Sequence, residues 1–196
     1  MEDSLPGVAT IFARCSPQFT ALTPYMPDPQ QDKSLFSLVQ IQHLMRVEFN
    51  RAQRYSYPVA CLLVSVDRLG HLRDLYGYES KEEIFEAVVG MLKIQTRCSD
   101  FLGRMADDRL LAVVPHTDGE GATVLANRLL DGARSMNFTA DGRTIQVTVS
   151  VGVSHNGGGT ALFFDAMFLA AEEALAAASS VGDCMQLLDP GGIAAE

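Results

Sequence analysis

Apolar residues recur at three- and four-residue steps in several stretches of the chain, and this spacing predicts amphipathic helices. The predicted helices cover residues 34–54, 68–75, 80–96, 120–136 and 161–178, and the second of them ends near Gly77. Continuous or alternating apolar runs predict strands over residues 59–64, 101–104, 110–114, 144–153 and 184–188. The run 59–64 is apolar throughout, which is typical of a central strand covered on both faces.

The connections between these strands predict the type of sheet. Helices separate most of the strands, but only a short polar turn separates 101–104 from 110–114, which indicates a hairpin. Helical crossovers together with a hairpin imply an α/β domain whose mixed central sheet is flanked by helices. We place this domain at residues 34–190.

The two ends of the chain carry no such pattern. A proline-containing N-terminal tail is predicted over residues 1–33, because closely spaced prolines prevent a continuous helix or strand there: Pro17, Pro24, Pro27 and Pro29. Residues 191–196 are predicted to be a C-terminal tail.

Composition and net charge exclude several classes of protein. Hydrophobic residues make up 47% of the 196 positions, which is enough for the core of one domain. No apolar run reaches the roughly 18 residues of a membrane span, and the acidic start does not resemble a secretory signal, so we expect a cytoplasmic protein. The net charge of −9 disfavours nucleic acid as a partner. The cysteines show no CxxC pairing, so we expect reduced thiols and no metal held by them.

Acidic residues stand where strands are predicted to end. Asp67 follows the strand 59–64, and Asp107 and Asp108 lie in the turn of the hairpin. Ligands bind at strand ends in α/β sheets, and converging carboxylates could hold Mg²⁺ for phosphoryl transfer. Asp is also common in turns for conformational reasons alone, and spacing by itself favours that explanation.

Six short segments follow one another along the chain: Arg51–Tyr55, Leu62–Asp67, Leu75–Tyr78, Arg97–Asp100, Val147–Val153 and Ala171–Leu175. In their order and spacing, from about Leu35 to Leu188, they resemble the GGDEF domain of bacterial diguanylate cyclases. The resemblance implies a nucleotide-cyclase-like fold and a relation to cyclic di-GMP signalling.

The resemblance also places the signature of the family on Ala106–Leu110, where only Asp108 agrees with it. The family's metal-binding Glu corresponds to Arg109, and its metal-binding Asp at the first strand corresponds to Ser65. Asp67 matches a second, less critical acidic position. A guanidinium repels Mg²⁺ and cannot ligate it.

Other positions implied by the resemblance have changed as well. The Lys and Arg that hold the GTP phosphates correspond to Ser179 and Asp183. We therefore expect a degenerate domain that is not an enzyme, needs no cofactor and has Ser65, Asp67, Asp107, Asp108 and Arg109 as a remnant active site. On this view Asp108→Ala alters stability little, because a turn carboxylate without a metal makes few contacts.

One functional element of the family matches. Its product-binding inhibitory site has the pattern Arg-x-x-Asp, and Arg97 and Asp100 stand at the expected distance before Ala106, with Arg128 at the position of a further arginine. An arginine fork can bind a guanine edge or a phosphate, and a carboxylate can accept from guanine N–H groups. A local surface ion pair at a helix end is the alternative explanation for Arg97 and Asp100.

Two functions follow from these observations. The first is a catalytically inactive receptor or regulatory module that binds cyclic di-GMP through Arg97, Asp100 and Arg128. The alternative is a protein-interaction or dimerisation module that uses the same scaffold and binds no nucleotide. In either case we expect a protein partner or a homodimer.

Overall fold

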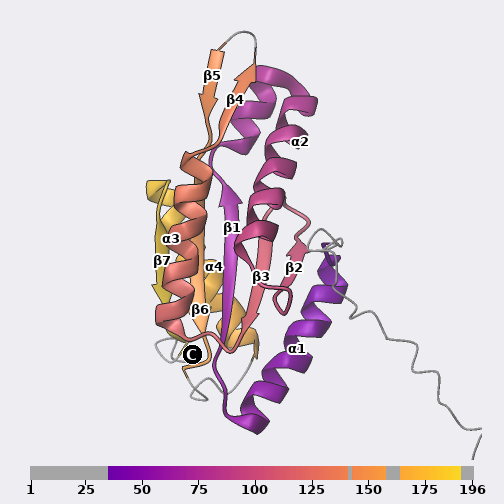
Figure 1. The fold of residues 1–196 in the computed structure, drawn as a ribbon, viewed down its shortest axis with the longest axis vertical. Helices are drawn as coiled ribbons and strands as arrows, with labels where there is room; N and C mark the ends of the chain where they lie inside the picture. The colour runs from indigo at the N-terminus through magenta and orange to yellow at the C-terminus, as the bar shows by residue number, and fades with distance from the viewer. Residues whose placement is uncertain (1–34, 141–142, 158–163, 191–196) are drawn as a thin grey trace, which may run out of the picture. The chain divides into compact units, whose positions relative to one another are not determined.

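A computed structural model describes residues 35–140, 143–157 and 164–190 of the chain (Figure 1). Both predicted tails, residues 1–33 and 191–196, therefore lie outside the described residues. The helices are α1 (Leu38–Tyr55), α2 (Leu69–Gln95), α3 (Gly119–Arg134) and α4 (Phe164–Val181). The strands are β1 (Val59–Val66), β2 (Phe101–Arg104), β3 (Leu110–Pro115), β4 (Asn137–Ala140), β5 (Arg143–Gln146), β6 (Val149–His155) and β7 (Met185–Leu188).

Five of these strands form one sheet in the order β2-β3-β1-β6-β7. Strand β1 is central and runs antiparallel to both β3 and β6, whereas β7 pairs parallel with β6. The sheet is therefore mixed, and helices flank it (Figure 1), which confirms the predicted fold class. Strands β4 and β5 form a separate hairpin beyond the end of this sheet.

Successive side chains of β1 point to opposite faces, as the pleat requires, and each face has its own core. Leu62 and Val64 pack with residues of α2 and α3. Cys61 and Leu63 pack with residues of α1 and α4. The uninterrupted apolar run of β1 is thus explained by burial on both sides, as predicted.

The helix α2 combines the two helices predicted over 68–75 and 80–96. Gly77 divides it with non-helical backbone angles, φ 88° and ψ 174°. A residue with a Cβ adopts a positive φ at a cost, so glycine suits this break. Ser80, the first residue of the second predicted helix, lies inside α2 and donates its hydroxyl to the carbonyl oxygen of Tyr76 at 3.1 Å.

The predicted strand 144–153 is in fact two strands, β5 and β6, that belong to different sheets. Strand β4 was not predicted. In the part of the chain that the structure describes, no helix is both long and apolar enough to cross a membrane.

Candidate functional site

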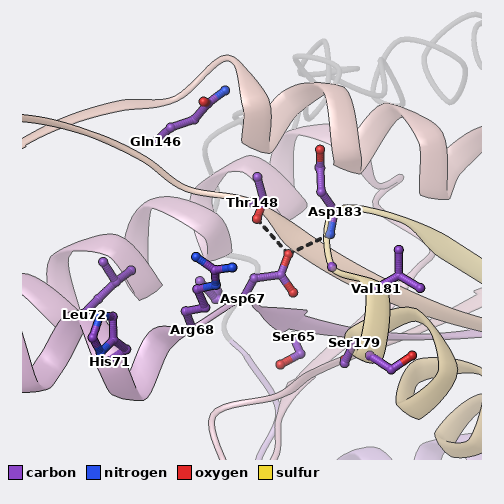
Figure 2. A pocket seen from close by; sticks show the side chains of 13 residues that line it. Ser65, Asp67, Arg68, His71, Leu72, Gln146, Thr148, Ser179, Val181 and Asp183 are labelled. Atoms are coloured by element: carbon purple, nitrogen blue, oxygen red, sulfur yellow. Dashed lines mark hydrogen bonds between the residues drawn. The ribbon is translucent and has the colours of Figure 1, made fainter.

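A pocket of about 730 Å³ opens at the end of β1 (Figure 2). Its walls come from the end of β1, the start of α2, the end of β5 and the residues that follow it, the last turn of α4, and the loop after α4. The lining includes Ser65, Asp67, Ser179 and Asp183, which were singled out from the sequence, and also Arg68 and His71. The pocket therefore contains two residues of the predicted remnant site together with the two positions at which the resemblance implies phosphate-binding side chains.

Asp67 ties three elements of the pocket together. Its carboxylate accepts hydrogen bonds from the hydroxyls of Thr148 at 2.7 Å and Ser150 at 2.6 Å, and from the backbone N–H of Asp183 at 2.9 Å. Figure 2 shows two of these bonds. Most of the carboxylate's hydrogen-bonding capacity is thus used within the protein, so Asp67 holds the loop after α4 against the sheet.

The turn between β2 and β3 lies beside the same end of β1, because Val64 pairs with Leu110. Arg109 directly precedes Leu110, and its guanidinium forms ion pairs with Asp107 in the turn and with Glu172 of α4, the second at 3.0 Å. Its side chain is one quarter exposed. Arg109 therefore binds two carboxylates of the protein next to the position of Ser65.

Asp108 turns away from the pocket towards α2. It accepts hydrogen bonds from Lys81 and Arg104, and both cations also lie near Glu82, at 3.4 and 3.5 Å. Burial alone would raise the pKa of Asp108, but the bonds from Lys81 and Arg104 outweigh it and hold the pKa below its usual value. Our expectation that this carboxylate makes few contacts is therefore wrong.

The remnant-site residues do not converge on one point. Asp67 binds hydroxyls, Asp107 binds Arg109, and Asp108 binds Lys81 and Arg104. Among the described residues, no group of three or more His, Cys, Asp and Glu side chains could hold a metal ion. The metal positions implied by the resemblance carry a hydroxyl and a guanidinium that is already ion-paired, so the residues present do not fit a divalent cation.

The residues predicted to bind cyclic di-GMP lie at the opposite end of β2 from this turn. Asp100 is 7% exposed, and its carboxylate accepts a hydrogen bond of 2.6 Å from the backbone N–H of Arg97. The side chain of Arg97 is exposed. The local surface ion pair considered as an alternative is therefore not what joins these residues, because Asp100 binds the amide of Arg97 and not its guanidinium.

Arg128 reaches this region from α3. Its guanidinium donates two hydrogen bonds to the side-chain oxygen of Gln95, from Nε at 3.1 Å and from Nη2 at 2.6 Å. Gln95 is the last residue of α2 and stands two positions before Arg97. The structure thus brings Arg97, Asp100 and Arg128 into one neighbourhood. Gln95 was not singled out from the sequence, because a lone Gln near the end of a predicted helix carries no signal of a contact with another helix.

Comparisons with known proteins agree on the family. Residues 34–183 match the family model described as diguanylate cyclase, GGDEF domain. Diguanylate cyclase A of Treponema denticola is 25% identical over 122 residues, which are 62% of this chain and 32% of that protein. Diguanylate cyclase DgcM of Escherichia coli is 29% identical over 143 residues, which are 73% of this chain and 32% of that protein. The chain thus spans about a third of the length of these curated relatives.

Solved structures show the same fold. The GGDEF domain of DgcB from Caulobacter crescentus, in complex with c-di-GMP, has a TM-score of 0.73 at 12% identity and covers 81% of this chain and 92% of that one. Diguanylate cyclase SiaD of Pseudomonas aeruginosa, in complex with its activator SiaC, has a TM-score of 0.71 at 22% identity. The match covers 79% of this chain and 58% of that one.

These comparisons correct one expectation. We expected from Ser65 and Arg109 that the chain is not an enzyme. The family description and the names of the curated relatives are those of an enzyme, diguanylate cyclase, and this contradicts the expectation.

Proposed function

The chain belongs to the GGDEF domain family, and we propose that its domain, over residues 34–190, is a regulatory domain that binds cyclic di-GMP at Arg97, Asp100 and Arg128. The observation that carries the proposal is a pair of exposed arginines, Arg97 and Arg128, that form no ion pair with a described carboxylate. Within the described residues, no carboxylate forms an ion pair with Arg97 or Arg128. Both side chains are exposed.

The contrast with the remnant site supports this choice of location. There, Arg109 binds Asp107 and Glu172, and Asp108 binds two cations, so each charge is matched within the protein. A ligand with two phosphates gains little from a cation that already has a carboxylate partner, whereas an unpaired guanidinium can form a planar, charge-assisted pair with it.

Each proposed side chain has a distinct role in binding. Arg97 donates to a guanine edge or to a phosphate, and Arg128 supplies a second cation or a plane on which a base can stack. Asp100 holds the turn through the amide of Arg97, and we assign its carboxylate as the acceptor for guanine N–H groups. The complex of DgcB with c-di-GMP supports a ligand of this class for the family, and the activator of SiaD supports a protein partner.

Isothermal titration calorimetry of the full chain with cyclic di-GMP tests the proposal. Arg97→Ala and Arg128→Ala should each weaken binding about tenfold or more, because each removes a charged contact of about 1.5–3 kcal/mol. Arg46→Ala is the matched control: it removes one exposed cation of α1, 65% exposed, and should leave the affinity unchanged. Equal weakening by all three variants would indicate a general charge effect and not a site.

Asp100→Ala separates recognition of guanine from attraction of phosphate. The substitution raises the local positive charge, so it should strengthen binding if phosphate attraction alone holds the ligand. We expect weaker binding, because the turn loses its support and the guanine loses an acceptor. If the wild-type chain shows no binding at high micromolar ligand, the proposal fails, and a protein-interaction or dimerisation module remains.

A further inference from the structure

Gln95 is the only described residue that hydrogen-bonds the guanidinium of Arg128, and it does so with a single oxygen that accepts two bonds. The partner is neutral, so the positive charge of Arg128 is not cancelled. A carboxylate in the same place would fix the arginine equally well but would neutralise it. The contact thus restricts the arginine and keeps its charge available.

The packing of α2 against α3 makes this contact possible. A Cβ added at Gly132 would lie 3.1 Å from both Cγ and Sδ of Met91, which is tighter than ordinary packing. Gly132 therefore lets α3 approach α2 closely one turn beyond Arg128. This close approach brings the guanidinium of Arg128 within reach of the end of α2, beside the turn that carries Arg97 and Asp100.

We infer that Gln95 is a positioning residue of the proposed ligand site, which holds Arg128 in place for cyclic di-GMP without neutralising it. The inference rests on the proposed function. A free, exposed arginine loses much rotamer entropy when it binds a ligand. The two bonds from Arg128 to Gln95 restrict that freedom before the ligand arrives, so their loss should weaken binding although Gln95 itself need not touch the ligand.

Gln95→Met removes the acceptor and keeps the length of the side chain. From the cost of ordering one long side chain, the affinity for cyclic di-GMP should fall roughly threefold to tenfold. Gln186→Met on β7 is the matched control, an identical change at an exposed position, and should have no effect. Gln95→Glu keeps an acceptor but pairs a negative charge with Arg128 at contact distance, where salt screens little, so its affinity should also fall below that of the wild type.

A double-mutant cycle shows whether Gln95 acts through Arg128. In the background of Arg128→Ala, Gln95→Met should cause no further loss, because there is no guanidinium left to hold. Full additivity of the two losses would overturn the inference, since Gln95 would then act on the ligand independently. So would a wild-type affinity for Gln95→Met.

The outcomes also separate this inference from the proposed function. If the wild-type chain does not bind cyclic di-GMP, both are overturned. If the wild type binds and Arg97→Ala weakens binding as expected, but Gln95→Met has no effect, only the positioning role of Gln95 is overturned. The Nε–H resonance of Arg128 provides a check without ligand: it should exchange slowly with water in the wild type and rapidly in Gln95→Met.

Discussion

Asp108 should contribute more to stability than a turn residue usually does. Its carboxylate is 27% exposed and binds Lys81, whose side chain is only 11% exposed, together with Arg104. The backbone of Asp108 has a φ of +59°, in the left-handed region. Asp108→Asn removes the charge and keeps a residue that tolerates this conformation, whereas Asp108→Ala removes the charge and adds backbone strain.

The expected losses follow from these contacts. A hydrogen bond to a charged group contributes about 1.5–3 kcal/mol, and loss of the bond from Lys81 also leaves a nearly buried ammonium with Glu82 alone. The pair with Arg104 counts for less, because a third of that side chain is exposed to solvent. We expect Asp108→Asn to lower the free energy of unfolding by about 1–3 kcal/mol, and Asp108→Ala by about 1 kcal/mol more.

Urea denaturation followed by circular dichroism measures both losses. Asp74→Asn is the control, since Asp74 and its partner Arg73 are each more than half exposed, and its effect should stay below about 0.5 kcal/mol. If Asp108→Asn matches Asp74→Asn, the reasoning from burial is refuted. If Asp108→Ala equals Asp108→Asn, the left-handed backbone carries no cost.

The same pair predicts a dependence on pH. The folded-state pKa of Asp108 is lowered, so its contribution is fully present above the unfolded pKa of about 3.9 and is lost as the pH falls through the folded value. The hydrogen bond to Asp108 raises the pKa of Lys81, so the contribution of Lys81 is lost only as the pH rises above about 10.4. The difference between wild type and Asp108→Asn should thus be constant from about pH 5 to 9 and shrink in acid.

Three further predictions concern the rest of the domain. Gly152→Ala should destabilise by more than about 3 kcal/mol in the same denaturation assay, because its Cβ would lie 2.3 Å from backbone atoms of Ala171 and Leu175 in α4. Cys98 is exposed, whereas Cys61 is buried and burial raises its pKa to about 12. An aromatic disulfide reagent should therefore modify Cys98 in the folded protein and Cys61 only after unfolding, which peptide mass analysis measures. Burial and the hydrogen bond to Glu48 raise the pKa of Tyr57 to about 12, so Tyr57→Phe should remove a tyrosine step near pH 12 from an absorbance titration.

The helices and the central strands were predictable because their patterns are local. Leu62 and Val64 face one core and Cys61 and Leu63 the other, so a continuous apolar run suffices to predict the central strand. Strand β4 was missed because it has only four residues, which is too short a run for the alternation of exposed Asn137 and Thr139 with half-buried Phe138 to stand out. The division between β5 and β6 depends on a change of sheet partner, which the composition of the run does not reveal.

The contacts of the site were not predictable, because they join residues far apart in the chain. Lys81 and Asp108 are 27 positions apart. Asp67 is 116 positions from Asp183, whose backbone N–H donates a hydrogen bond to the Asp67 carboxylate. Each pair is created by the packing of a helix or loop on the sheet. Spacing drew attention to Asp67 and Asp108 but favoured an ordinary turn role for them, and only the fold shows that hydroxyls and cations of the protein bind their carboxylates.

The position of β2 explains how an acidic protein can offer a site to a doubly anionic ligand. Asp100 and Met105 lie at the two ends of this strand, about 17 Å apart at the rise of an extended chain. That separation exceeds the Debye length of about 10 Å at 0.1 M salt, so the carboxylates around the turn have little effect on the potential at Arg97. The net charge of −9 is likewise a sum over the whole surface. At the end of α2 a ligand meets the guanidinium groups of Arg97 and Arg128 and the single carboxylate of Asp100. Within the described residues no ion pair neutralises either arginine, and this local excess of positive charge supports the proposed site.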